Sequence, residues 1–241
     1  LGGWGGRPAA HELAARLGVP VAVDNDANLG ALAELSLGAG RGAADLIYLK
    51  VSSGIGAGLV LDGRLHHGAS GIAGELGHVQ LRRDGDVCRC GNRGCLETVA
   101  SSAAVLELLR PVLGPDLTLP GALELARAGH VAVRRVLADA GRAVGRAVAD
   151  LCNMLNPEAI VVGGDLSRAG DALLEGVREA VDRYALPAAA RAVRVVAGRL
   201  GERAEVLGAL TLVIGEGEYL LRPRYFANRL DSADRVGIAL A

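Results

Sequence analysis

The feature that most constrains the fold of this chain is a segment rich in glycine, histidine and cysteine that lacks hydrophobic periodicity. It spans residues 66–97 and contains His78, Cys88, Cys90 and Cys95. A stretch without apolar spacing builds no core of its own, so another interaction has to hold it in shape. One histidine and three cysteines supply the four ligands that structural zinc prefers, and the glycines let the backbone wrap around an ion. We therefore predict a zinc loop here.

Free buried thiols or a disulfide are the alternatives to zinc for the three clustered cysteines. Zinc is favoured because no signal peptide opens the sequence, which predicts a cytoplasmic, reducing location where disulfides are rare. Because protein side chains would fill all four positions, no place is left for a catalytic water, and we expect the metal to be structural. The fourth cysteine, Cys152, lies alone in a helical pattern as a small hydrophobic residue, and we assign it no role.

The composition excludes several classes of protein. Of the 241 residues, 51% are hydrophobic and 22% are charged, with a net charge of −1, which is typical of a globular chain with a real core. Basic residues are scattered and offset by acidic ones, so we expect no DNA contact from this sequence itself. No apolar run approaches the roughly 18 residues of a membrane-spanning helix, so we expect no membrane contact. The single methionine is Met154, and we therefore expect the sequence to begin inside a longer or processed protein.

Short apolar runs alternate with helical patterns on both sides of the predicted zinc loop. The spacing predicts strands at 19–24, 46–51, 59–65, 160–162 and 193–196. It predicts helices at 26–37, 133–155, 172–184 and 202–214. A glycine-rich turn is expected at 54–58 and a tight turn at Asp62-Gly63, whereas His66 and His67 are expected to face solvent. Alternating strands and helices predict an α/β domain.

Four segments occur in an order and spacing that resemble the signatures of a known family. Gly74–Glu97 reads Gly-Glu-Leu-Gly-His, then residues 79–87, then Cys-Arg-Cys-Gly-Asn-Arg-Gly-Cys-Leu-Glu. The other three are Val23–Asn28, Ser53–Gly58 and Ile160–Gly164. Together they resemble the ROK family, which comprises sugar-responsive repressors and sugar kinases, over about residues 3 to 212.

The resemblance implies an actin-like ATPase (ribonuclease H-like) fold, in which two α/β lobes enclose a sugar in the cleft between them. Residues 1–28 would then end the N-terminal lobe, and 29–200 would form the large sugar-binding lobe with its zinc loop at 74–97. The helix at 201–215 would return to the first lobe, and 216–241 would be a C-terminal extension. The family's Asp-x-Gly-x-Thr phosphate loop and the repressors' winged helix-turn-helix are both absent from the sequence, and we expect them to precede it.

The resemblance also implies a set of sugar-binding residues. They are Asn25, Asp26, Glu75, His78 and Glu97. Carboxylates and amides pair with neighbouring hydroxyls, and zinc on one ring nitrogen of His78 would aim the other nitrogen at a sugar hydroxyl. The alternative is that Asp26 only caps its helix, and that Glu75 and Glu97 are solvated or capping carboxylates.

Catalytic and nucleotide-binding roles follow from the resemblance to the kinases of the family. There, the Asp that matches Asp26 is the general base that takes the proton from the attacking sugar hydroxyl. The positions that match the family's nucleotide-binding segments are Ser53, Gly54, Gly56, Gly58, Gly163 and Gly164. Glycine-rich hairpin turns are common, and the family's kinases usually have Gly-Thr where this sequence has Ser52-Ser53.

The favoured hypothesis is the sugar-effector-binding and oligomerising half of a ROK transcriptional regulator. The cysteine segment and Ser52-Ser53 look more like the repressors of the family than its glucokinases. DNA would be bound only through the winged helix-turn-helix. The alternatives are a truncated ATP-dependent sugar kinase that uses MgATP, from which we expect negligible turnover without the first phosphate loop, and a remnant that binds no ligand. We expect a homodimer or homotetramer in each case.

Overall fold

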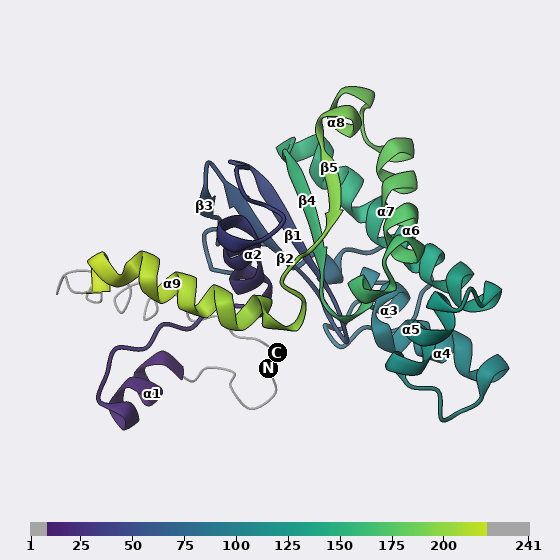
Figure 1. Cartoon of the computed structure of the whole chain (residues 1–241), viewed down its shortest axis with the longest axis horizontal. Coiled ribbons are helices and arrows are strands. Elements are labelled where there is room, and N and C mark those ends of the chain that lie inside the picture. Colours follow the sequence, from purple (N-terminus) through teal and green to yellow (C-terminus); the bar gives the residue numbers. More distant parts are fainter. Residues whose placement is uncertain (1–8, 221–241) are drawn as a thin grey trace.

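The apolar runs of the sequence pair into a five-stranded sheet in the order β3-β2-β1-β4-β5 (Figure 1). The structure is a computed structural model, and it describes residues 9–220. The strands are β1 (Leu46–Val51), β2 (Ile55–Leu61), β3 (Arg64–Leu65), β4 (Ala159–Gly163) and β5 (Arg194–Ala197). Strand β1 pairs antiparallel with β2 and parallel with β4, which in turn pairs parallel with β5. The α/β prediction is confirmed.

Helices cover both faces of this sheet. They are α1 (Ala9–Leu17), α2 (Asp26–Leu37), α3 (Leu96–Ala100), α4 (Ser102–Leu113), α5 (Leu119–Arg127), α6 (Val131–Leu155), α7 (Asp171–Tyr184), α8 (Pro187–Ala192) and α9 (Ala204–Leu220). Alternate residues of β1 point to opposite faces. Ile47 and Leu49 join a large core with α6 and α7, whereas Leu46 and Tyr48 join a smaller core beneath α2.

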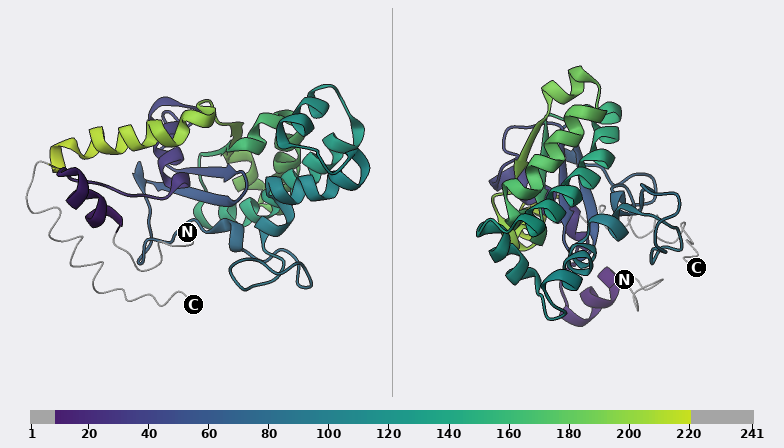
Figure 2. Two further views of the ribbon diagram at one scale, coloured as in Figure 1. Left: turned by 90° about the horizontal axis from the view of Figure 1, so that it is seen from below. Right: turned by 90° about the vertical axis from the view of Figure 1, so that its right-hand side faces the viewer.

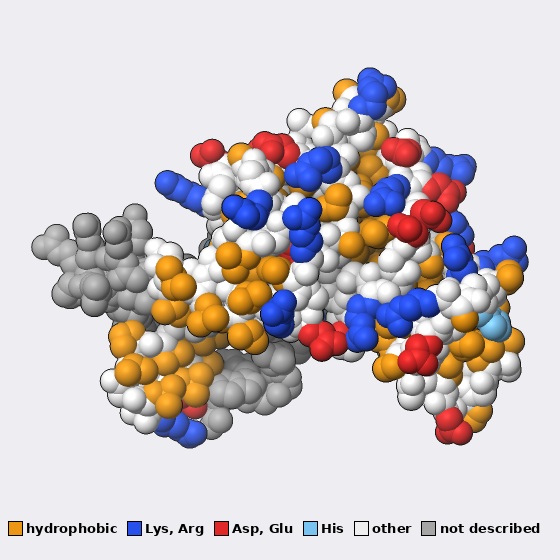
Figure 3. Space-filling view, in the orientation of Figure 1, with side chains coloured by type: hydrophobic (Ala, Val, Ile, Leu, Met, Phe, Trp, Pro, Cys, Tyr) orange, Lys and Arg blue, Asp and Glu red, His pale blue; other side chains and the backbone are white. Residues whose placement is uncertain are grey.

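On each face of the sheet, a glycine allows two helices to pack closely. A Cβ at Gly141 of α6 would lie 2.1 Å from the carbonyl oxygen of Leu173 in α7. On the other face, a Cβ at Gly208 of α9 would lie 1.9 Å from the carbonyl oxygen of Leu29 in α2. Helix α9 then runs past the sheet toward the side where α1 lies (Figure 1, Figure 2). Apolar side chains gather over α9 and α1 in Figure 3.

Two predictions of secondary structure were wrong. The run Val19–Asp24 is not a strand but irregular chain, with Val19 and Val23 more than half exposed. A β-branched run becomes a strand only when a neighbouring backbone pairs with it, and none of the described residues does so. The glycine-rich stretch 54–58 is also largely strand: the turn lies at residues 52–54, and β2 starts at Ile55. The Asp62-Gly63 turn between β2 and β3 is confirmed.

The lobe boundaries inferred from the family resemblance remain predictions. Helix α2 starts at Asp26, before the proposed boundary at 28/29, and buries Ala27 and Ala31 against the sheet. Helix α9 packs on α2 and continues to Leu220, so the C-terminal extension lies mostly outside the described residues. Among the described helices, none is long and apolar enough to cross a membrane.

Candidate metal centre and ligand site

The four predicted metal ligands come together in space. The candidate ligand atoms of His78, Cys88, Cys90 and Cys95 all lie within 4.8 Å of one another. The Sγ of Cys88 is 3.5 Å from Nδ1 of His78, and the Sγ atoms of Cys90 and Cys95 are 3.7 Å apart. Tetrahedral zinc, with bonds of about 2.3 Å to sulfur and 2.0 Å to nitrogen, would separate its ligands by about 3.5–3.8 Å. The cluster therefore fits a four-coordinate ion.

A disulfide does not fit the same atoms. A disulfide has sulfurs about 2.05 Å apart, and the cysteines are free. Burial, assisted by hydrogen bonds with Cys90 and Cys88, raises the pKa of the Cys95 thiol to about 12. At neutral pH this buried sulfur therefore keeps its proton unless a cation replaces it. The chemistry of the donor set is that of a closed, structural metal site.

Backbone hydrogen bonds and two left-handed glycines shape the loop around this site. The backbone N–H of Cys88 donates to the carbonyl of Asn92 at 2.7 Å, and that of Gly91 donates to the carbonyl of Cys88 at 2.9 Å. Gly94 has a φ of +64°, and a Cβ there would lie 1.7 Å from the carbonyl oxygen of Arg82. Only glycine can occupy this position without moving the backbone that carries Cys95.

His78 connects the metal cluster to the candidate ligand site. Its Nδ1 faces the sulfur of Cys88, whereas its Nε2 is 3.8 Å from Oε2 of the exposed Glu75. A metal on Nδ1 would thus leave an Nε2–H that faces Glu75. The turn that carries His78 packs on β2, because a Cβ at Gly77 would lie 2.2 Å from the carbonyl oxygen of Ile55.

Glu97 lies at the junction of the metal loop and the sheet. Helix α3 starts directly after Cys95, so Glu97 is in its first turn and is 8% exposed. Its Oε2 accepts the backbone N–H of Ile55 at 3.0 Å, and its Oε1 is 2.9 Å from Nε of Arg89. Arg89 stands between two metal ligands in the sequence, and sequence analysis assigned it no role. The charge of Glu97 is compensated before any ligand binds.

Asn25 and Asp26 lie at the start of α2 and have different local partners. Asn25 is the N-cap, and its Oδ1 accepts the backbone N–H of Ala27 at 2.8 Å. Asp26 Oδ2 instead pairs with Nζ of Lys50 at 2.8 Å, and the same Nζ is 2.7 Å from Oε1 of Glu205 in α9. Burial lowers the pKa of Lys50, but hydrogen bonds with the two carboxylates outweigh it and the pKa is raised overall.

Asp24 and His67 form a further polar pair next to Asn25. The Nε2 of His67 is 2.8 Å from Oδ2 of Asp24, while Oδ1 of Asp24 accepts the Asn28 side-chain amide at 2.7 Å. The prediction that His67 faces solvent was therefore wrong, since its side chain is 31% exposed and paired. The two residues are far apart in the sequence, so spacing gave no signal of this contact.

The two nucleotide-associated segments lie on either side of β1, and packing already explains several of their glycines. A Cβ at Gly58 would lie 2.4 Å from the carbonyl oxygen of Ala27, and one at Gly163 would lie 2.2 Å from the Tyr48 hydroxyl. Ser52 joins the two segments, because its Oγ accepts the backbone N–H of Asp165 at 2.9 Å, directly after Gly164. Gly54 differs, since a Cβ there would face the carboxylate of Glu97 at 2.9 Å.

The sugar-associated residues form two groups around the start of β2. Glu75, His78 and Glu97 surround residues 54 and 55, whereas Asn25 and Asp26 stand beside Lys50 at the end of β1. Gly56 lies near the second group, because a Cβ there would be 3.4 Å from Cβ of Ala27. A site that included both groups would combine α2, the β1–β2 hairpin, the metal loop and α3.

These features define the class of protein: a mixed α/β chain with an actin-like ATPase fold and a candidate metal cluster beside a polar site. The chain belongs to the ROK family, whose family model matches residues 2–216. It is 37% identical to a glucokinase of Halalkalibacterium halodurans over 88% of this chain and 68% of the relative. It is 33% identical to a xylose repressor of Caldicellulosiruptor bescii over 88% of this chain and 57% of the relative.

Solved structures of both functional kinds resemble this fold. A ROK family transcriptional regulator, described as a homologue of the Escherichia coli Mlc protein, aligns with a TM-score of 0.79 and 30% identity. The alignment covers 94% of this chain and 58% of the regulator. A ROK family glucokinase from Streptomyces griseus, in complex with glucose and AMPPNP, aligns with a TM-score of 0.76 and 31% identity over 85% of this chain and 72% of the kinase. The chain thus spans a little over half of the repressor relatives.

Proposed function

We propose that this chain is the sugar-binding and oligomerising half of a sugar-responsive transcriptional regulator. The observation that carries the proposal is the ion pair between Asp26 and Lys50, with Nζ 2.8 Å from Oδ2. In phosphoryl transfer the residue at this position has to accept a proton from the sugar hydroxyl. Taking up a proton at Asp26 would abolish its attraction to an ammonium group that Glu205 also holds at 2.7 Å.

Binding a sugar without chemistry asks less of the same residues. Asp26 retains its Oδ1, and Asn25 retains its side-chain amide, for hydrogen bonds with hydroxyl groups. Nε2 of His78 and the half-exposed Glu75 would meet the sugar from the metal loop, with Glu97 beneath them. Zinc at the cluster would fix the direction of His78. DNA binding would belong to a winged helix-turn-helix in a longer protein.

Calorimetry on the zinc-loaded chain tests this proposal. Glucose, xylose, N-acetylglucosamine and N-acetylmannosamine would each be titrated with and without MgATP. We expect saturable binding of one of these sugars that does not depend on MgATP. Glu97→Gln is expected to weaken it by about tenfold or more, since it removes a charge-assisted partner. The control Asp182→Asn, on the exposed surface of α7, should bind as the parent does. Binding that requires nucleotide would contradict the proposal.

The second candidate is a sugar kinase that uses MgATP. It is favoured by the glucokinase relatives at 37% and 39% identity, which share more sequence with this chain than the repressor relatives at 31–35% do. Asp26 would then be the general base, and the segments at residues 53–58 and 163–164 would approach the nucleotide. A coupled assay for sugar-dependent ADP formation distinguishes the two candidates. Turnover on the order of 1 s⁻¹ or faster would establish the kinase.

A further inference from the structure

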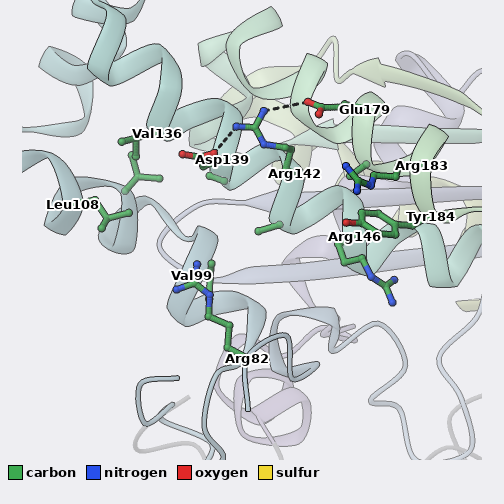
Figure 4. Close-up of a pocket in the computed structure, with 14 residues that line it drawn as sticks. Arg82, Val99, Leu108, Val136, Asp139, Arg142, Arg146, Glu179, Arg183 and Tyr184 are labelled. Carbon is green, nitrogen blue, oxygen red and sulfur yellow. Dashed lines mark hydrogen bonds and ion pairs between the residues drawn. The ribbon is translucent and has the colours of Figure 1, made fainter. Parts of the chain in front are cut away.

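A second concave site lies against the α6–α7 layer, away from the β1–β2 hairpin. Its volume is about 530 Å³, and it is lined by α6, α7, side chains of α3 and α4, and one residue of the metal loop. Figure 4 shows basic side chains around it. The arginines that line it are Arg82, Arg142, Arg146 and Arg183. Neither the candidate sugar site nor the candidate nucleotide segments contribute to this pocket.

The positive charge of this pocket is only partly compensated. Arg142 pairs with Glu179 at 3.1 Å and also with Asp139, and those two carboxylates are the acidic groups of the lining. Within residues 9–215, no carboxylate forms an ion pair with Arg82 or Arg183. Arg146 also pairs with Asp150 of α6, which lies just outside the lining, at 2.7 Å. The four arginines are thus opposed by three carboxylates, and the pocket keeps a net positive charge.

Two of the arginines are gathered around one aromatic ring. The guanidinium carbon of Arg146 is 5.0 Å from the centre of the Tyr184 ring, and that of Arg183 is 5.5 Å from it (Figure 4). One arginine comes from α6 and the other from α7. Attraction to the ring and the pair of Arg146 with Asp150 offset part of their mutual repulsion, and an anion beside Arg183 would offset more. Guanidinium groups match phosphate oxygens with paired hydrogen bonds.

The remaining walls are apolar. Val99, Leu108 and Val136 line the pocket together with alanines of α6 and α7. A bare inorganic ion would leave these walls without a partner. The volume lies within the range of small-molecule sites, and the combination of arginines with an apolar wall suits a phosphate attached to an organic group. We propose that this arginine pocket binds a small organic phosphate.

The arginine pocket is joined to the metal loop through Arg82. Its backbone N–H donates to the carbonyl of Gly94 at 3.1 Å, and Gly94 directly precedes the metal ligand Cys95. Val99, which also lines the pocket, belongs to α3, the helix that carries Glu97. A phosphate that holds Arg82 against α6 and α7 therefore also holds the segment that carries the metal. Occupation of the pocket stabilises the metal loop.

The test uses the zinc-loaded chain without sugar, so that its result does not depend on the proposed function. The probes are phenyl phosphate, inorganic phosphate and phenol at constant ionic strength, measured by calorimetry. We expect saturable binding of phenyl phosphate, weaker binding of inorganic phosphate and none of phenol. Arg146→Gln combined with Arg183→Gln should weaken binding of phenyl phosphate by about tenfold or more. Arg135→Gln, on the exposed surface of α6, is the matched control and should bind as the parent does.

Two further measurements distinguish loss of the binding site from unfolding of the double variant. Arg82→Gln changes an exposed loop side chain outside the α6–α7 pair, so it should weaken binding without unfolding that pair. With phenyl phosphate at about ten times its dissociation constant, transfer of zinc to a chelator should slow by up to about tenfold. Equal binding by parent and double variant, or a dimer that dissociates when the two arginines are replaced, would overturn the proposal.

Discussion

Lys50 has a position that distinguishes this site from a simple cluster of acidic groups. Its Nζ joins Asp26 of α2 and Glu205 of α9, so one ammonium group holds the start of two helices against the end of β1. The side chain of Lys50 is 21% exposed and that of Glu205 is 27% exposed, whereas that of Asp26 is 59% exposed. Water therefore screens the pair with Asp26 more than the pair with Glu205. A ligand that engages Asp26 therefore acts on the contact between α2 and α9.

Replacing Lys50 by alanine should destabilise the protein by about 1.5–3 kcal/mol, because two carboxylates lose a charge-assisted hydrogen bond. Urea unfolding would measure this loss. The matched control is Arg168→Ala, which removes the 2.8 Å pair with Glu202. Glu202 is 73% exposed, so the control should cost less than about 1 kcal/mol. Equal losses in the two variants would show that the Lys50 contacts are ordinary surface pairs.

Cys95 should be required for metal content, whereas Cys152 should not. We expect Cys95→Ser to hold less than one zinc per chain and to melt at a lower temperature, because a structural site loses a thiolate ligand. Metal analysis and thermal unfolding would measure both effects. Cys152→Ala is the control, since this buried thiol lies in α6 outside the cluster. Unchanged zinc content in Cys95→Ser would rule out the proposed ligand set.

At the scale of elements, the pairing of α9 with α2 depends on one small residue. A Cβ at Gly208 would lie 1.9 Å from a backbone oxygen of Leu29, and a backbone atom cannot move aside as a flexible side chain can. Gly208→Ala should cost about 1–3 kcal/mol in the free energy of unfolding, even though alanine favours helix. Gly215→Ala in the same helix meets nothing within 4 Å and should stabilise it by about 0.5–1 kcal/mol. Chemical denaturation of both variants measures the contrast.

The elements differ in how far the sequence alone predicts them. The helix expected at 133–155 is α6, because its apolar spacing and the Asn156-Pro157 stop are local properties. The strand expected at 19–24 did not form, because a strand depends on a partner that its own residues do not specify. Helices α3, α4 and α5 were not predicted from the sequence.

The same distinction applies to the site. The ligands His78, Cys88, Cys90 and Cys95 lie close together in the sequence, so their spacing predicted the cluster that the structure shows. The contacts of Lys50 with Asp26 and Glu205 join three separate elements. No spacing rule connects those elements, and the family resemblance named only Asp26. Contacts of this kind depend on the tertiary fold, so the sequence pattern does not predict them.

For the whole molecule, the metal should couple the order of the loop to ligand binding. The loop joins the sheet through Glu97, which accepts the backbone N–H of Ile55, and through the turn that carries His78. A chelator that removes zinc should therefore lower the melting temperature and weaken sugar binding together. Restoring zinc should restore both, while magnesium should not, because a site of three sulfurs and one nitrogen suits a softer ion. Sugar affinity that is unchanged after complete zinc removal would show that sugar binding does not depend on the metal site.

The retention of zinc should depend on pH in a direction that the thiols determine. Burial raises the pKa of Cys95 to about 12 in the metal-free protein, so zinc must displace its proton at neutral pH. Protons and zinc then compete for the same sulfur, and metal-dependent stability is present at higher pH and lost as pH falls. Each displaced proton changes the apparent zinc affinity by about tenfold per pH unit, so we expect at least that slope between pH 6 and 8. Competition with a chromophoric chelator at several pH values measures the slope, and a flat profile would mean that Cys95 does not bind the metal as a thiolate.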